Sequence, residues 1–290
     1  MRLQLFRSLW TNGFNLDAAL ADCRTGAFDG VEGPVPDKPA ARGVFAAKLR
    51  EAGVPFIAEI ATGGGYVPSV SSPEEQLAEF RAKAEAALEC APLLLTVLAG
   101  RDAWPLAQSV DFFGRAIAVA QELGVAASFE THRGRPTFNP WATAALLAQL
   151  PALSLTCDFS HWCCVCERLV LDDEPDLLAR CAARARHIHV RVGYAQGPQV
   201  PHPAAPEYRM ALEAHERWWR VLWSAQEGAG KNLSTMTPEF GPDGYLQTQP
   251  FTAMPAANLD EINRWMAVRQ REHFARRHDA RIETPVLAPT

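Results

Sequence analysis

Eight short runs rich in β-branched or aromatic residues recur along the chain, and they constrain its fold more than any other feature. They cover residues 3–10, 30–35, 55–61, 93–99, 126–131, 153–158, 187–192 and 233–239. Stretches with apolar residues at intervals of three and four lie between them, as in amphipathic helices, for example at residues 73–90, 110–123, 140–150, 175–185, 206–227 and 259–274. Strands that alternate with helices form parallel sheets through right-handed crossovers.

Eight strand–helix units predict an α/β fold of the (β/α)₈ TIM-barrel type, with a parallel eight-stranded sheet. The alternative is an open doubly wound sheet, but no GxGxxG motif follows the first run. A length of 290 residues is usual for one barrel. We therefore expect a single TIM-barrel catalytic domain over residues 1–275 and a C-terminal tail over residues 276–290.

The charge and hydropathy of the chain limit its partners. The formal net charge is −5, which gives no global basic field for a polyphosphate, so we expect no nucleic-acid partner. No stretch approaches the roughly 20 uninterrupted apolar residues that a membrane span needs. The sequence therefore predicts a soluble, cytoplasmic protein without a membrane partner.

The seven cysteines do not resemble a disulfide framework, because four of them cluster at Cys157, Cys163, Cys164 and Cys166. The WCCVC stretch lacks the paired spacing of structural zinc sites, and no second CxxC motif occurs. We expect reduced thiols that serve as buried small residues beside a strand.

Four polar residues lie at or near the ends of the last four runs: Glu130, Asp158, His189 and Glu239. Three carboxylates and one imidazole suit a divalent cation, because hard oxygen ligands with one nitrogen fit Mg²⁺, Mn²⁺, Co²⁺ or Zn²⁺. The carboxyl ends of barrel strands carry the catalytic groups of TIM barrels. The sequence thus predicts one divalent metal ion at the barrel mouth and a metal-dependent enzyme.

Strand parity places further polar residues on the same inward faces, because residues two apart on a strand share a face. The predicted sets are Ser128, Glu130 and His132; Thr156, Asp158 and Ser160; His187, His189 and Arg191; and Thr235, Thr237 and Glu239. Each carboxylate could instead be buried in an ion pair with Arg133, Arg135 or Arg191, and His187 is expected to be a hydrogen-bonded residue one layer below His189.

The ordered motifs resemble a known family. ETH at 130–132, DxxH at 158–161, HxH at 187–189 and PEFGP around Glu239 look like the xylose isomerase-like TIM barrel superfamily of sugar phosphate isomerases and epimerases. The early FDGVEG and EIATGG segments also resemble it. The resemblance implies that Glu130, Asp158, His189 and Glu239 are metal ligands, and that Glu130 and Glu239 are also the catalytic acid/base pair. It implies that His161 binds substrate and that the protein is a homo-oligomer.

One departure from the family concerns the segment after the seventh strand. Keto-sugar epimerases and hydroxypyruvate isomerases of this superfamily usually have an arginine several residues beyond the histidine and a Pro-Gly-rich loop. Here Arg191 lies only two residues beyond His189, in the segment VRVGYAQGPQVPHPAAPEY. The substrate therefore stays open.

The expected activity is isomerisation or epimerisation of a sugar, a sugar derivative or a small hydroxy-keto compound, by proton abstraction through an enediolate. His132 and Arg191 are expected to bind substrate with His161, and Arg191 could contact a carboxylate in bidentate fashion. Glu32, Trp10 and Trp162 are further candidates, although Glu32 could face the helix layer and the tryptophans could pack against loops.

Three alternatives remain at this point. A dehydratase of the inosose dehydratase type uses the same proton abstraction followed by loss of a hydroxyl. A phosphodiester hydrolase like the abasic-site endonucleases needs histidines on the third and fourth strands, whose ends here read ATGGG and LAGRD. A non-catalytic ligand-binding barrel would be favoured if the four residues held no metal.

Overall fold

Eight parallel strands close into a barrel in the computed structural model, which describes residues 1–65, 67–242 and 244–279. Each strand pairs with its sequence neighbours, and β1 pairs with β8 to complete the ring. The predicted (β/α)₈ TIM barrel is therefore confirmed. The strands are β1 (Arg2–Ser8), β2 (Gly30–Gly33), β3 (Phe56–Ala61), β4 (Leu94–Leu98), β5 (Ala127–Glu130), β6 (Leu155–Cys157), β7 (Ala185–Val190) and β8 (Leu233–Pro238).

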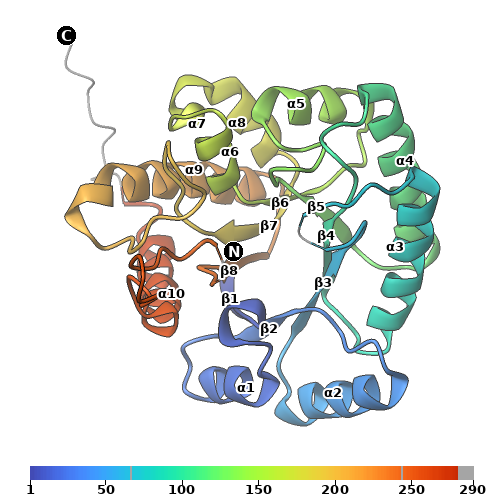
Figure 1. Ribbon diagram of the computed structural model, residues 1–290, viewed down its shortest axis with the longest axis horizontal. Coiled ribbons are helices and arrows are strands. Elements are labelled where there is room, and N and C mark those ends of the chain that lie inside the picture. Colours follow the sequence, from blue (N-terminus) through green and yellow to red (C-terminus); the bar gives the residue numbers. More distant parts are fainter. Residues whose placement is uncertain (66, 243, 280–290) are drawn as a thin grey trace.

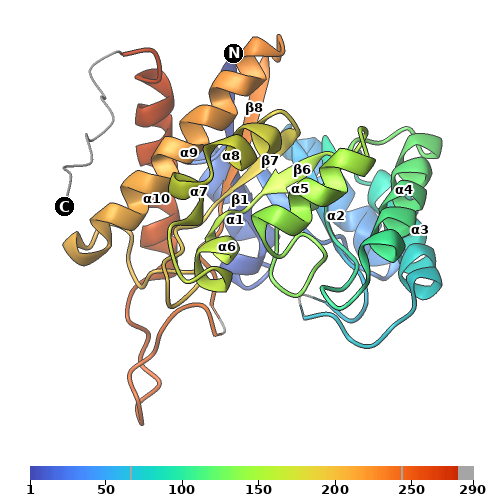
Figure 2. The ribbon, with the colours of Figure 1, turned by 90° about the horizontal axis from the view of Figure 1, so that it is seen from above.

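Helices surround the barrel on all sides in the view down its axis (Figure 1). They are α1 (Leu16–Arg24), α2 (Pro39–Ala52), α3 (Pro73–Leu88), α4 (Leu106–Glu122), α5 (Pro140–Gln149), α6 (Ser160–Val165), α7 (Val170–Asp173), α8 (Pro175–Ala182), α9 (Arg209–Gly228) and α10 (Leu259–Ala275). The 3₁₀ turn η1 (Trp10–Asn12) follows β1, and a second, η2 (Pro206–Tyr208), precedes α9. Seen from the side, the segment between β8 and α10 projects away from the barrel (Figure 2).

Local capping explains where several helices begin. The Ser72 side chain accepts from the backbone of Glu75 while the Glu75 side chain accepts from the backbone of Ser72, a complete capping box. Asn139 and Asn258 cap α5 and α10 through their side chains. Each of these polar residues stands immediately before a stretch with apolar residues at helical spacing.

Some predicted boundaries were wrong. Residues 183–185 do not continue the predicted helix, because Ala185 already pairs with Leu155 and begins β7. The predicted helix over 206–227 is divided into η2 and α9. The first strand ends at Ser8, so Trp10 lies in a 3₁₀ turn. All seven cysteines are free, as expected; Cys157 is buried on β6, whereas Cys163 and Cys164 lie on the short helix α6.

The barrel interior changes from apolar to polar along its axis. Phe6, Ile57 and Leu94 form a separate apolar cluster at the N-terminal end. Above them, Ser128 hydrogen-bonds Thr156 (2.7 Å between hydroxyl oxygens), and all the side chains that parity assigned to this face are buried. The polar part of the interior leads to the C-terminal mouth.

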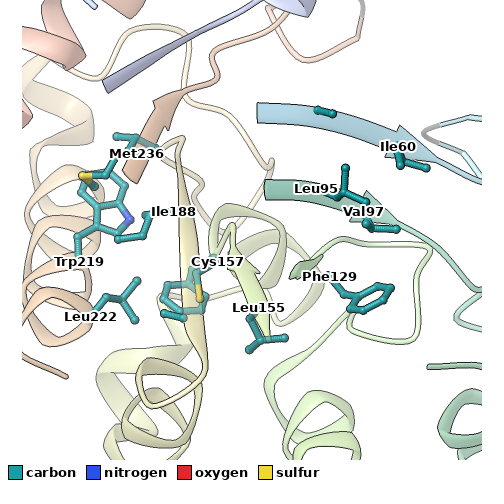
Figure 3. Close-up of a cluster of buried hydrophobic side chains, with 14 of the residues drawn as sticks. Ile60, Leu95, Val97, Phe129, Leu155, Cys157, Ile188, Trp219, Leu222 and Met236 are labelled. Atoms are coloured by element: carbon teal, nitrogen blue, oxygen red, sulfur yellow. The ribbon is translucent and has the colours of Figure 1, made fainter. Parts of the chain in front are cut away.

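The outward faces of the strands pack against the helices and form the main core. Ile188 and Met236 lie against Trp219 and Leu222 of α9, and Phe129 and Leu155 continue the layer around the barrel (Figure 3). The HERWW stretch at 215–219 belongs largely to this core, since His215, Trp218 and Trp219 are buried. These contacts hold the strand ends in place.

The helix α10 ends at Ala275, close to the predicted domain limit. Of the predicted tail 276–290, residues 280–290 lie outside the described residues. In the part of the chain that the structure describes, no helix has the length and apolar character required to cross a membrane.

Candidate functional site

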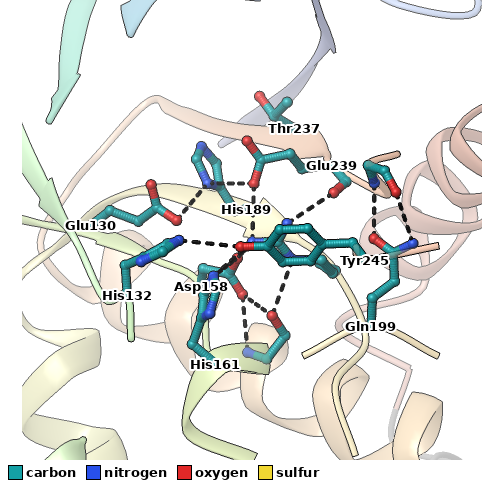
Figure 4. Close-up of polar contacts among 12 residues, drawn as sticks. Glu130, His132, Asp158, His161, His189, Gln199, Thr237, Glu239 and Tyr245 are labelled. Carbon is teal, nitrogen blue, oxygen red and sulfur yellow. Dashed lines mark hydrogen bonds and ion pairs between the residues drawn. The ribbon is translucent and has the colours of Figure 1, made fainter. Parts of the chain in front are cut away.

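Three carboxylates and one imidazole meet at the C-terminal mouth of the barrel. Glu130 ends β5, Asp158 follows β6, His189 lies on β7 and Glu239 follows β8. All four are buried, and one ligand atom from each lies within 4.8 Å of the others. Figure 4 shows the side chains converging from these four strands. The structure thus brings together the set that the sequence identified.

The orientation of His189 suits a cation. Its Nε2 lies 3.0 Å from Glu32 Oε1, so the hydrogen on Nε2 donates to that carboxylate. Its Nδ1 is buried without a hydrogen-bond partner among the described residues. Glu239 Oε2 and Glu130 Oε1 lie 3.1 Å and 3.5 Å from Nδ1. In the neutral form of His189 the Nδ1 lone pair would lie between carboxylate oxygens, an arrangement that fits a divalent ion of the kind that takes mixed oxygen and nitrogen ligands.

Glu32 lies below this set, where it links two histidines. His187 Nε2 lies 3.0 Å from Glu32 Oε2, and the Thr237 hydroxyl donates to the same oxygen. His187 Nδ1 lies 2.7 Å from the Thr235 hydroxyl. Glu32, expected to bind substrate, thus faces the barrel interior and supports His189. His187 is the hydrogen-bonded residue one layer below His189.

Asp158 has protein partners on both carboxylate oxygens. Its Oδ1 accepts from the backbone N–H of Ser160 at 3.0 Å and from the Ser160 hydroxyl. Its Oδ2 accepts from Arg191 Nη2 and lies 3.5 Å from His161 Nε2. The Thr131 hydroxyl donates to the Asp158 carbonyl at 2.7 Å and accepts from its backbone N–H at 2.8 Å. Asp158 is therefore held firmly.

The site concentrates negative charge. Burial raises the pKa of Glu130 to about 7, and the carboxylates of Glu239 and Asp158 act in the same direction. Burial likewise raises the pKa of Asp158. Burial disfavours the imidazolium of His189, yet the carboxylates of Glu239, Glu32 and Glu130 raise its pKa well above the usual value. The carboxylates therefore outnumber the positive groups that neutralise them.

His132 and His161 are stacked beside the carboxylates, with 3.8 Å between ring centroids. His132 Nδ1 donates to the Arg133 carbonyl, which leaves Nε2 as an acceptor. His161 Nε2 accepts from Arg191 Nη2 at 2.8 Å, so its hydrogen is on Nδ1. Burial lowers the pKa of both histidines well below the usual value. They are neutral groups that can bind substrate hydroxyls.

A small cavity of about 10 Å³ remains above the site, with room for about one water molecule. Its lining residues are Trp10, Leu98, Glu130, His132, Arg191, Glu239 and Tyr245. Tyr245 covers it: the ring lies 4.7 Å from the Arg191 guanidinium, and the hydroxyl lies 3.4 Å from His132 Nε2 (Figure 4). Tyr245 comes from the segment after β8, and nothing in the sequence pattern marked it.

The two tryptophans expected to bind substrate differ in position. Trp10 lines the cavity and packs so closely on Gly241 that a Cβ there would lie 1.9 Å from its ring. Trp162 is fully buried on α6, where its indole N–H donates to the Thr137 carbonyl at 2.8 Å and its ring packs on Phe159. Trp162 is not among the residues that line the described cavity.

Two buried amides fix the chain immediately after Glu239. Asn263 exchanges hydrogen bonds with the backbone of Phe240 at 2.9 Å and 3.0 Å. Gln199 does the same with Gly241 at 3.1 Å and 2.8 Å. Both amides lie far from Glu239 in sequence and carry no motif. Only the tertiary structure reveals that they position it.

No protein-family model matches the chain, and no curated protein sequence matches it. Solved structures do match. A D-allulose 3-epimerase from Methylomonas sp. superimposes with a TM-score of 0.61 at 13% identity, over 95% of this chain and 98% of that chain. A probable 3-DHS dehydratase, AsbF, from Bacillus anthracis gives 0.59 at 12% identity, over 92% and 98%. An endonuclease IV from Thermus thermophilus gives 0.57 at 13% identity, over 95% and 99%.

The chain shares its TIM barrel fold with xylose isomerase-like proteins. Matching structures also include a xylose isomerase domain protein and an IolI protein with a bound zinc atom. The matching structures include epimerases, a probable dehydratase and an endonuclease. At 12–13% identity they establish the fold of this barrel and leave its activity to be argued from the site.

Proposed function

We propose that this barrel is a divalent-metal-dependent isomerase or epimerase that acts on a sugar, a sugar derivative or a small hydroxy-keto compound. The observation that carries the proposal is the set of three buried carboxylates that meet at His189, with Glu239 and Glu130 oxygens 3.1 Å and 3.5 Å from its Nδ1. Glu130, Asp158, His189 and Glu239 would hold one Mn²⁺, Mg²⁺, Co²⁺ or Zn²⁺. The likeness to an epimerase and to a zinc-bound barrel supports this proposal.

The bound ion would polarise a carbonyl and a neighbouring hydroxyl of the substrate, which makes the carbon between them more acidic. Glu130 and Glu239 come from β5 and β8, three strands apart around the barrel, and both face His189 Nδ1. They are therefore placed to reach a substrate from two sides. One carboxylate removes the proton and the other returns a proton, which inverts the carbon or moves the carbonyl.

The remaining residues hold the substrate. His132, Trp10 and Arg191 line the cavity, and neutral His161 lies against His132. A sugar needs far more room than about 10 Å³, so Tyr245 must move when substrate binds. Glu32 and Trp162 act through the structure, the first by orienting His189 and the second by packing α6. Homo-oligomerisation stays a prediction from the resemblance.

The test begins with metal analysis of the purified protein. A panel of ketoses, inososes and keto acids is then incubated in D₂O with Mn²⁺, and deuterium on carbon is measured by NMR. We expect exchange in the wild type and a loss of about 100-fold or more in Glu130→Gln and Glu239→Gln. Glu122→Gln, an exposed carboxylate on α4, is the control and should exchange normally.

Other outcomes separate the alternatives. Exchange accompanied by loss of a hydroxyl identifies a dehydratase, since the proton abstraction is shared. Cleavage of a phosphodiester without exchange identifies a hydrolase. A protein that binds a ligand but holds no metal and exchanges no hydrogen would be a non-catalytic ligand-binding barrel. That result would contradict the proposal.

A further inference from the structure

A permanent positive charge already lies inside the proposed ligand set. Arg191 follows β7 on the same face as His189, and its side chain is buried. Its Nη2 hydrogen-bonds Asp158 Oδ2 and lies 3.4 Å from Glu239 Oε2. A guanidinium therefore contacts two of the three carboxylates that would bind the metal.

The guanidinium and a metal would need the same oxygen lone pairs. Asp158 Oδ1 is occupied by the backbone and hydroxyl of Ser160, so Oδ2 is the oxygen left for a cation. That oxygen is the one that Arg191 holds. Two positive charges at such a separation also repel each other, and burial weakens the screening by water. Metal binding must therefore displace part of the Arg191 contact.

The rest of the Arg191 side chain is anchored independently of the ligand oxygens. Its Nε donates to the Ser160 hydroxyl at 3.2 Å, and Nη1 donates to the Glu239 carbonyl at 3.4 Å. The rings of Tyr245 and Trp10 lie 4.7 Å and 5.8 Å from its central carbon. Arg191 can thus yield the Asp158 oxygen from Nη2 while it stays at the site.

The Arg191 guanidinium and the His189 imidazolium together do not neutralise the four buried carboxylates of Glu32, Glu130, Asp158 and Glu239. The remaining negative charge still attracts a cation, so Arg191 lowers the affinity without abolishing it. Without metal, Arg191 offsets part of the repulsion among the carboxylates and keeps the site assembled.

We propose that Arg191 is an internal counter-ion that competes with the metal for Asp158 and Glu239, so that the metal is held weakly and exchanges readily. The inference rests on the metal site of the proposed function. It assigns Arg191 a positioning role in addition to any contact with substrate.

The experiment measures Co²⁺ binding by calorimetry and by visible absorption in the wild type, Arg191→Met and Arg191→Lys. We expect Arg191→Met to bind Co²⁺ at least tenfold more tightly and to melt at a lower temperature without metal. Arg191→Lys keeps the charge and should bind with an affinity between the two. Arg133→Met is the control, because the Arg133 guanidinium also lies against the Tyr245 ring, at 5.1 Å. It should leave Co²⁺ affinity unchanged.

Near-ultraviolet circular dichroism establishes whether each variant is folded. If Arg191→Met does not fold, Arg191→Lys takes its place in the comparison with the wild type. Equal or weaker Co²⁺ binding by Arg191→Met, or by Arg191→Lys in its place, would overturn the inference and leave the metal site intact. If Arg191→Met binds Co²⁺ and the wild type does not, the competition between Arg191 and the metal is supported, and Arg191 excludes the ion completely. Absence of binding in every protein would overturn the metal site and the inference together.

Discussion

Glu32 controls the proposed metal site at the scale of single residues. Its carboxylate accepts hydrogen bonds from His187, His189 and Thr237, so it leaves Nδ1 of His189 as the nitrogen that faces the other acids. A carboxylate behind a metal-binding histidine fixes the tautomer and raises the basicity of the ligand nitrogen. Burial acts against the charged form of Glu32, but the two histidines lower its pKa well below the usual value.

We predict that Glu32→Gln weakens metal binding about 10–100-fold. Glutamine has one acceptor where glutamate has two, so its amide hydrogens would oppose an N–H of His187 or His189. Co²⁺ titration by calorimetry measures the change. Glu89→Gln is the matched control, because Glu89 pairs with Arg42 at the surface. Unchanged affinity in Glu32→Gln would show that Glu32 does not orient the ligand.

Sequence reasoning at this scale depended on parity. It placed Glu130 and His189 on inward faces because they lie on strands, where alternate residues share a face. Tyr245 and Gln199 lie in irregular segments without such a period, so no pattern pointed to them. The contact of Arg191 with Asp158 depends on side-chain conformations from two strands, and sequence spacing does not fix these. From the sequence alone, arginine pairing is therefore one of the alternatives for these carboxylates.

At the scale of elements, the junction of β7 with α6 depends on Gly193. A Cβ at this position would lie 2.3 Å from the Ser160 carbonyl oxygen at the start of α6. Ser160 also binds Asp158 and Arg191. A displacement of α6 would therefore reach the proposed ligands.

We predict that Gly193→Ala destabilises the protein by about 1–3 kcal/mol and weakens Co²⁺ binding, since the backbone must move to admit the methyl group. Gly43→Ala is the control within α2, where a Cβ would meet no atom within 4 Å. It should stabilise by about 0.5–1 kcal/mol, because glycine disfavours helix interiors. Urea unfolding gives both values. A neutral Gly193→Ala would contradict the close approach.

The helix α9 contacts the same junction through His215. Its Nδ1 donates to the Ala211 carbonyl at 2.8 Å, and its Nε2 accepts from the Gly193 N–H at 3.3 Å. The bond from Gly193 needs the neutral imidazole, because a protonated Nε2 has no lone pair to accept it, whereas the bond to Ala211 is kept in either form. Burial lowers the pKa of His215 to about 4.

This lowered pKa predicts a pH-dependent stability. Above a pH of about 6.5 the histidine is neutral in both states and its contribution is complete. As the pH falls from about 6.5 to 4, His215 binds a proton in the unfolded chain but stays neutral in the folded state. The free energy of unfolding therefore falls by about 3 kcal/mol. His215→Gln should show a smaller decline over this range in urea unfolding. Parallel curves for the two proteins would rule out a contribution from His215.

For the molecule as a whole, the barrel could be predicted because its signal is repeated. Eight alternations of strand and helix agree on one topology, so an error of one or two residues at Ala185 or Trp10 does not change the result. The gathering of charged residues at the mouth then follows from closure, which brings the ends of β5 to β8 together. The position of Tyr245 over that mouth does not follow from closure, because it depends on how the long segment between β8 and α10 folds back.

Closure also links the stability of the barrel to its metal. The carboxylates that would bind the ion come from β5, β6 and β8, so their mutual repulsion acts across a large part of the ring. An ion bound only by the folded state stabilises it in proportion to the logarithm of the free metal concentration. We predict that the free energy of unfolding rises by about 2.7 kcal/mol when the concentration of free Mn²⁺ or Co²⁺ is about 100-fold above its dissociation constant. For a domain of this size each kcal/mol raises the melting temperature by about 2–4 °C.

Calorimetric scans with a metal series measure this shift, and EDTA should reverse it. Asp158→Asn removes one ligand charge and should lose most of the shift, whereas Glu122→Gln, whose carboxylate pairs with Arg81 at the surface, should keep it. Arg191→Met should show a larger shift than the wild type, because its metal-free state retains the full repulsion. A wild-type melting temperature that does not respond to any divalent ion would mean that arginine and protonated histidine already satisfy the carboxylates.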